Sequence, residues 1–116
     1  MTIMIVDDHH DIRRLLKQII NVGKSQSHYF VECESGEEAV RQYSECKPDL
    51  VLMDIELKAM DGLDAATMIL NQNSAANILI VSSHNSPSVR RKAAEIPISG
   101  FISKDDLSQV YNHIYN

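Results

Sequence analysis

The sequence predicts an α/β fold in which five parallel strands alternate with five helices. Short apolar runs recur along the chain and are nearly continuous, as in strands that are buried on both faces of a parallel sheet. Between these runs, apolar residues recur at the spacing of an amphipathic helix. Strands that are joined by helices in this way form a parallel sheet with right-handed crossovers and with helices on both faces.

The length and composition fit one compact domain. Of the 116 residues, 44% are hydrophobic and 23% are charged, and a domain of this size buries roughly two-thirds of the surface that its unfolded chain exposes. We therefore expect a single domain over residues 1–116. No apolar run approaches the roughly 20 residues that cross a bilayer, and no signal segment opens the sequence. These features predict a cytoplasmic protein without a membrane partner.

The charge balance argues against direct binding to nucleic acid. Eleven Lys and Arg residues against sixteen Asp and Glu residues give a net charge of −5, and the basic residues are scattered along the chain. Proteins that bind nucleic acid present a basic surface to the phosphates. We expect no such contact by this segment.

The first half of the chain contains two strand–helix units. The expected strands are Thr2–Val6 and His28–Cys33. After the first strand, apolar residues at helical spacing predict a helix that Gly23 closes. Its apolar face is formed by Ile12, Leu15, Leu16, Ile19 and Ile20. The second helix begins at a capping-box pattern that Ser35 and Glu38 form.

The second half of the chain contains three more units. We expect strands over Leu50–Met53, Asn77–Val81 and Ile98–Ser103. Asp61 begins the third helix, and Ser86 followed by Pro87 is typical of the start of a short fourth helix. This helix would end at Glu95, because Pro97 disfavours helical backbone just before it. The last helix carries an apolar face formed by Leu107, Val110, Tyr111 and Ile114.

Polar side chains follow four of the five expected strands at the point where each strand ends. They are Asp7 and Asp8 after the first strand, Asp54 after the third, Ser82 and Ser83 after the fourth, and Lys104 after the fifth. In an open parallel sheet, ligands bind outside the carboxyl ends of the strands. These residues therefore predict the functional site. The alternative is that all of them are ordinary loop and cap residues. In that case four strands would end in polar residues at the same edge of the sheet without serving a function.

The residue types at these strand ends predict magnesium-dependent phosphoryl transfer. Three carboxylates that lie close together repel one another unless a cation neutralises them, and Mg²⁺ prefers oxygen ligands of this kind. Lys104 and Ser82 supply an ammonium and a hydroxyl that would bind the oxygens of a transferring phosphoryl group. Asp54 is the expected nucleophile, because an aspartate accepts a phosphoryl group as an acyl phosphate.

Blander interpretations of single residues stay open. Asp7 and Asp8 would otherwise cap the first helix, and Lys104 would be a solvated loop residue. His9 and His10 beside the aspartates suggest a transition-metal site. We expect Mg²⁺ instead, because adjacent residues on a helix do not face one way and oxygen-rich sites favour Mg²⁺.

The sequence resembles the receiver domains of two-component response regulators. The matching segments follow in order along essentially the whole chain: Ile5-Val6-Asp7-Asp8-His9, Met53-Asp54-Ile55, Met60-Asp61-Gly62, Val81-Ser82-Ser83-His84 and Gly100-Phe101-Ile102-Ser103-Lys104. The resemblance implies a flavodoxin-like, doubly wound sheet with the strand order 2-1-3-4-5.

The resemblance also implies a phosphorylated switch rather than an enzyme, one that assists its own phosphorylation and dephosphorylation. Asp54 would accept a phosphoryl group from the phosphohistidine of a sensor histidine kinase or of a phosphotransfer protein. Asp54 would hold Mg²⁺ together with Asp7 and Asp8, and the backbone carbonyl of Glu56 would be a further ligand. Lys104 would pair with the phosphoryl group.

Two further residues match the switch positions of the family. Ser82 would bind a phosphoryl oxygen, and Phe101 would swing inward when Ser82 moves. The last two strands and the helix between them would form the signalling face, which controls a partner, a homodimer or an output domain after Asn116. Lys104-Asp105 resembles the subgroup that precedes helix-turn-helix DNA-binding domains of the LuxR/NarL type, and we expect a trans peptide bond there.

Two variable positions flank the expected phosphoryl site. Glu56 and His84 lie two residues after Asp54 and Ser82, and we expect their side chains to set the lifetime of the phosphorylated state. Two other function classes stay open. One is a receiver-shaped interaction module that takes no phosphate. The other is a magnesium-dependent phosphatase of the haloacid dehalogenase type, which requires an aspartate where this chain has Glu56.

Overall fold

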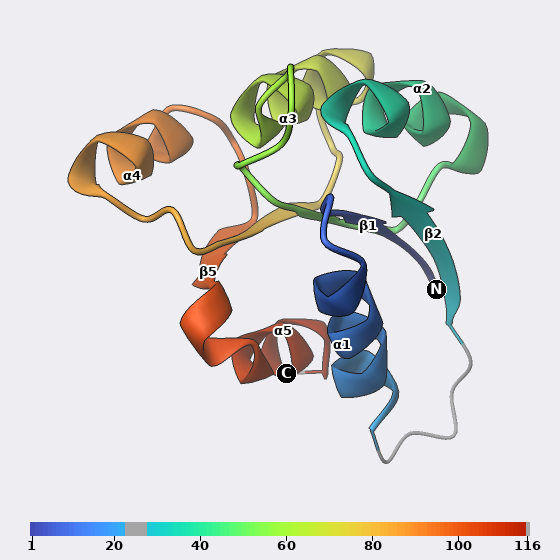
Figure 1. Cartoon of the computed structure of the whole chain (residues 1–116). Helices are drawn as coiled ribbons and strands as arrows, with labels where there is room; N and C mark the ends of the chain where they lie inside the picture. The colour runs from blue at the N-terminus through green and yellow to red at the C-terminus, as the bar shows by residue number, and fades with distance from the viewer. Residues whose placement is uncertain (23–27, 116) are drawn as a thin grey trace.

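The computed structural model describes residues 1–22 and 28–115, and Figure 1 shows its elements. In chain order they are β1 (Thr2–Val6), α1 (His10–Asn21), β2 (Tyr29–Cys33), α2 (Gly36–Cys46), β3 (Leu50–Met53), α3 (Gly62–Gln72), β4 (Ile78–Ser82), α4 (Pro87–Ala94), β5 (Gly100–Ser103) and α5 (Ser108–Tyr115). A short 3₁₀ turn, η1 (Lys104–Asp106), joins β5 to α5.

The five strands form one parallel sheet in the order β2-β1-β3-β4-β5. Helices α2, α3 and α4 cover one face of the sheet, and α1 and α5 cover the other (Figure 1). The predicted α/β class and strand order are confirmed. Within the described part of the chain, no helix is long and apolar enough to cross a membrane.

The central strands β1, β3 and β4 are buried on both faces, which explains their continuous apolar sequence. Alternate residues of a strand point to opposite faces of the sheet, so these strands supply two cores. On the side of α2 and α3 the strand residues are Met4, Val6, Val51, Met53, Ile78 and Ile80. On the side of α1 and α5 they are Ile3, Ile5, Leu50, Leu52, Leu79 and Val81.

The helix boundaries agree with the predicted caps. Ser35 Oγ accepts a hydrogen bond from the Glu38 N–H at 3.1 Å, and Ser86 caps α4 in the same way. Helix α4 ends at Ala94, one residue earlier than predicted and before Pro97. No peptide bond among residues 1–22 and 28–115 is cis, so the expected trans bond after the lysine of η1 is confirmed.

The structure differs from the sequence prediction at several element ends and on one face of α1. Strands β2, β4 and β5 begin one or two residues later than predicted. Helix α1 ends at Asn21, and the predicted closing residue Gly23 lies outside the described residues. Leu15, which the periodicity assigned to the buried face, is 41% exposed. The charged Arg13 is buried instead, at 6% exposure, because its guanidinium finds acceptors at the end of β1.

Gly62 allows the start of α3 to approach the end of β3. Its N–H donates a hydrogen bond to the carbonyl oxygen of Ile55 at 2.9 Å. A Cβ at this position would lie 1.8 Å from the carbonyl oxygen of Asp54 and 2.9 Å from Ile55 Cα. Both atoms belong to the backbone and have no rotamer with which to move away, so only glycine fits here.

We expect Gly62→Ala to lower the free energy of unfolding by about 3 kcal/mol, because the peptide plane after Asp54 must shift. Urea denaturation followed by circular dichroism measures the change. Gly36→Ala at the first position of α2 is the matched control, since its Cβ would lie 3.2 Å from the nearest atoms, and it should cost less than about 1 kcal/mol. Equal stability of the two variants would contradict this close approach.

Candidate functional site

The parallel register brings the predicted strand-end residues together at one edge of the sheet. Val6 pairs with Met53 across β1 and β3, so Asp7 and Asp54, which follow these residues, lie side by side. Both carboxylates are buried, with 2% of each residue exposed. On the next strand along the sheet, Ser82 is fully buried.

The ammonium of Lys104 joins the two buried carboxylates. Its Nζ lies 2.8 Å from Asp7 Oδ2 and 3.0 Å from Asp54 Oδ2. Only β4 separates β5 from β3. Lys104, which directly follows β5, therefore reaches across the end of β4 to Asp54. A buried carboxylate requires a counter-ion or hydrogen-bond donors, and one lysine serves both aspartates here.

Burial and neighbouring charge perturb the pKa of both sides of this contact. Burial raises the pKa of Asp54, and the charge of Asp7 raises it further, although the Lys104 hydrogen bond opposes the rise. For Lys104, burial alone lowers the pKa, but the hydrogen bonds and charges of Asp7 and Asp54 outweigh it, so the pKa is raised. The lysine is therefore charged at neutral pH, and the carboxylates retain an excess of negative charge.

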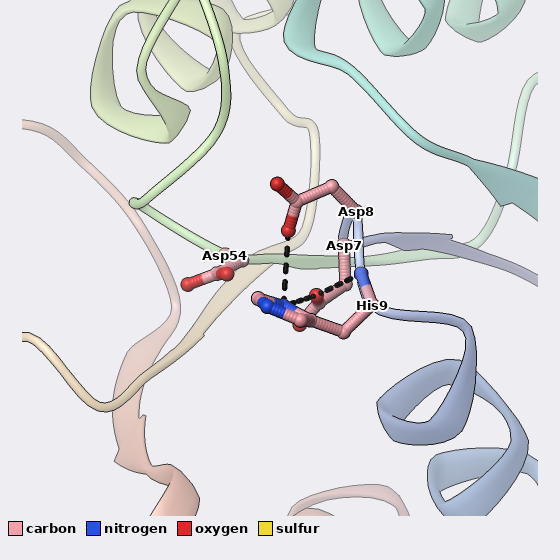
Figure 2. Close-up of side chains that lie close together, drawn as sticks. All are labelled: Asp7, Asp8, His9 and Asp54. Atoms are coloured by element: carbon pink, nitrogen blue, oxygen red, sulfur yellow. Dashed lines mark hydrogen bonds and ion pairs between the residues drawn. The ribbon is translucent and has the colours of Figure 1, made fainter.

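The residues around this excess charge fit a divalent cation. Asp7, Asp8, His9 and Asp54 each offer one ligand atom, and these atoms lie within 4.8 Å of one another (Figure 2). Asp8 Oδ1 is shielded from solvent and accepts no hydrogen bond from the residues that the structure describes. Carboxylate oxygens are the ligands that Mg²⁺ prefers. The donor set and the unsatisfied oxygen both match such an ion.

Sequence reasoning did not place His9 in this cluster. His9 is the residue before α1, and its backbone is extended, with φ −98° and ψ 110°. Its ring lies against the aspartates, with Nδ1 at 3.0 Å from Asp7 Oδ1 and 3.0 Å from Asp8 Oδ1 (Figure 2). Adjacent residues within a helix face different ways, but His9 precedes the helix and is not bound by this restriction. The sequence alone does not indicate that His9 precedes the helix whereas His10 begins it.

Arg13 is a second residue that sequence reasoning missed. Its Nη1 donates a hydrogen bond to the carbonyl oxygen of Asp7 at 2.7 Å, and its Nε donates to Glu32 Oε1 at 3.0 Å. Lys17 also donates to Glu32, and this hydrogen bond is the main reason why the pKa of Glu32 is lowered. These contacts of Arg13 and Lys17 tie α1 to β2, and that of Arg13 with the Asp7 carbonyl fixes the backbone at the end of β1.

The two predicted tuning residues lie beside the acidic cluster. Glu56 and His84 are exposed and line a hollow of about 530 Å³ that Asp8 also lines. The N–H of Glu56 lies 3.4 Å from Asp54 Oδ1, and the N–H of His84 donates to Ser82 Oγ at 3.1 Å. Each residue is thus attached through its backbone to a predicted site residue, while its side chain borders the hollow.

Phe101 is half-buried on β5 and is covered by a cation. The guanidinium carbon of Arg90, on α4, lies 4.2 Å from the centroid of the Phe101 ring, which is a cation–π contact. The aromatic ring thus links β5 to α4, the two neighbouring elements of the predicted signalling face. Arg90 was not singled out from the sequence, because nothing in the local pattern pairs it with Phe101.

Comparison with known proteins agrees with this arrangement. Residues 3–115 match the response regulator receiver domain family. Chemotaxis protein CheY of Halobacterium salinarum is 33% identical over 102 residues, which are 88% of this chain and 82% of that protein. Transcriptional regulatory protein YdfI of Bacillus subtilis is 32% identical over 111 residues, which are 96% of this chain but 51% of YdfI.

A solved structure shows the same fold. The two-component response regulator of the LuxR family from Aurantimonas sp. SI85-9A1 superposes with a TM-score of 0.87 at 33% identity, covering 97% of this chain and 81% of that chain. The match over nearly the whole sequence, together with the strand order and the acidic strand ends, shows that this chain belongs to the response regulator receiver domain family.

Proposed function

We propose that the protein is a signalling switch in which Asp54 accepts a phosphoryl group from a sensor histidine kinase or a phosphotransfer protein. The observation that carries the proposal is the lysine bridge, in which Lys104 contacts both Asp7 and Asp54. The family match over residues 3–115 supports one receiver domain over residues 1–116. We place this switch in the cytoplasm, where it would meet its kinase.

The arrangement suits transfer onto a carboxylate. An oxygen of Asp54 attacks the phosphorus of the phosphohistidine, the P–N bond breaks, and the imidazole leaves as the acyl phosphate forms. The Lys104 ammonium then exchanges its contact with the Asp54 carboxylate for a contact with a phosphoryl oxygen, because the negative charge now lies there. The Ser82 hydroxyl binds another of the phosphoryl oxygens. Mg²⁺, held by Asp7, Asp8, Asp54 and the carbonyl of Glu56, would neutralise the charge that remains.

The surface through which the switch would act is that of α4 and β5, the elements on either side of the contact between Phe101 and Arg90. When Ser82 moves toward the phosphoryl group, Phe101 would exchange its contact with Arg90 for an inward position, and the surface of α4 and β5 would change. This surface would control a partner, a homodimer or an output domain. The similarity to YdfI, a transcriptional regulatory protein, supports a role in transcription regulation.

We expect one phosphoryl group to be added when the protein is incubated with a small acyl-phosphate donor and Mg²⁺. Intact mass spectrometry measures the adduct. It should be absent in Asp54→Ala and after chelation of the metal, whereas Asp64→Ala, at an exposed aspartate in the first turn of α3, should retain it. An inert interaction module would give no adduct in any sample, and a phosphatase would instead release phosphate steadily from phosphomonoesters.

The phosphorylated state should be shorter-lived in Glu56→Ala and His84→Ala than in the wild type. Both truncations remove a side chain that lines the hollow beside Asp8 and so widen the path of the attacking water, and we expect the adduct to be lost about tenfold faster. Repeated intact-mass measurements after removal of the donor give the rate. Glu37→Ala, at an exposed position of α2, should decay at the wild-type rate. Decay at that rate in both test variants would contradict a tuning role.

A further inference from the structure

We infer that His9 supplies a nitrogen ligand to the acidic cluster, so that the site binds divalent transition-metal ions such as Zn²⁺ and Co²⁺ more tightly than Mg²⁺. This inference rests on the metal site of the proposed function and extends it to a different class of ion. The ligands are Asp7, Asp8 and His9, with Asp54 beside them.

The backbone places His9 over the cluster. Its N–H donates a hydrogen bond to Asp7 Oδ1 at 2.8 Å, which turns the chain back at the end of β1. The Nδ1 atom of the ring then lies close to the carboxyl groups of both Asp7 and Asp8 (Figure 2). Only the residue that precedes the helix can adopt this position, because His10 already has helical backbone.

The distances match ligands around one ion. Two ligands at right angles, each about 2.1 Å from a metal, lie about 3.0 Å apart. His9 Nδ1 has this separation, 3.0 Å, from Asp7 Oδ1 and from Asp8 Oδ1. Asp54 completes a set of four ligand atoms within 4.8 Å of one another. One ion could therefore contact the nitrogen of His9 together with one oxygen each of Asp7 and Asp8.

An unsatisfied oxygen points to a cation at this place. Asp8 Oδ1 is inaccessible to solvent and lies 3.0 Å from His9 Nδ1, an ion pair only when the ring is protonated, and no donor among residues 1–22 and 28–115 forms a hydrogen bond with it. A shielded carboxylate oxygen without a donor is unfavourable. A metal ion between Asp8 and His9 would satisfy it. The ring proton would then lie on Nε2 of His9, whose side chain is 65% exposed to water.

The types of ligand determine for which ions His9 raises the affinity of the site. Imidazole nitrogen suits Zn²⁺, Ni²⁺ and related ions, whereas Mg²⁺ prefers oxygen and retains several waters. Loss of the ring should therefore weaken the first class of ion and leave Mg²⁺, which the carboxylates hold, nearly unchanged. His10 provides the contrast, because its ring is 73% exposed and its Nδ1 lies 3.8 Å from the fully exposed Asp11.

The test is a titration of the metal-free protein, residues 1–116, with Zn²⁺, Co²⁺ and Mg²⁺ by isothermal calorimetry. We expect His9→Ala and His9→Gln to weaken Zn²⁺ and Co²⁺ binding at least tenfold and to change Mg²⁺ binding less than about twofold. His10→Ala should behave as the wild type. The visible absorption of bound Co²⁺ should change only in the His9 variants and should show no sulfur-to-metal band from Cys33 or Cys46.

The outcomes separate this inference from the proposed function. Unchanged Zn²⁺ and Co²⁺ affinity in both His9 variants, or an equal loss for all three ions, would overturn the role of His9. A wild-type protein that binds no Mg²⁺ would instead contradict the magnesium site of the proposed function. Circular dichroism of each variant checks the fold, which we expect to be intact because His9 is exposed.

Discussion

The contact of one lysine with two buried carboxylates is the interaction on which the site depends. Asp7 and Asp54 follow paired positions of neighbouring strands, so the fold forces their carboxyl groups together in a place that solvent hardly reaches. Without the ammonium of Lys104 at 2.8 and 3.0 Å, this juxtaposition would combine burial with repulsion. One positive charge does not balance three aspartates. The remaining negative charge is what a metal ion would neutralise.

The rest of the fold holds these groups in position. Arg13 binds the backbone carbonyl of Asp7, which fixes the end of β1 from the side of α1. Gly62 lets the start of α3 lie against the carbonyl oxygen of Asp54, which fixes the end of β3 from the opposite face. Lys104 arrives from the end of β5, beyond β4. A shift of any of these strand ends would lengthen a contact of Lys104 with Asp7 or Asp54.

Much of this arrangement follows from the sequence, and the exceptions have physical causes. The apolar runs of β1, β3 and β4 and the polar residues at their ends were sufficient to predict the sheet and to group Asp7, Asp54, Ser82 and Lys104. The strand order came from the family resemblance, since periodicity does not specify which strands are neighbours. Periodicity also failed in α1, where it placed Leu15 inside and overlooked Arg13, because it cannot anticipate acceptors on another element. The position of His9 depends on the extended backbone before a helix, which no spacing rule reports.

The most direct measurement is the free energy of unfolding of Asp54→Asn and of the wild type as a function of pH. Burial raises the pKa of Asp54 in the folded protein above that of an exposed aspartate. At a pH above the raised pKa, the ionised carboxylate therefore lowers the free energy of unfolding. Below the pKa of an exposed aspartate, Asp54 is protonated in both the folded and the unfolded state, and this loss disappears. Without Mg²⁺, the variant should be more stable than the wild type at about pH 8 and equally stable at about pH 3. Added Mg²⁺ should stabilise the wild type more than the variant. A variant that is less stable at about pH 8, or whose advantage persists at about pH 3, would contradict an excess of buried negative charge at this site.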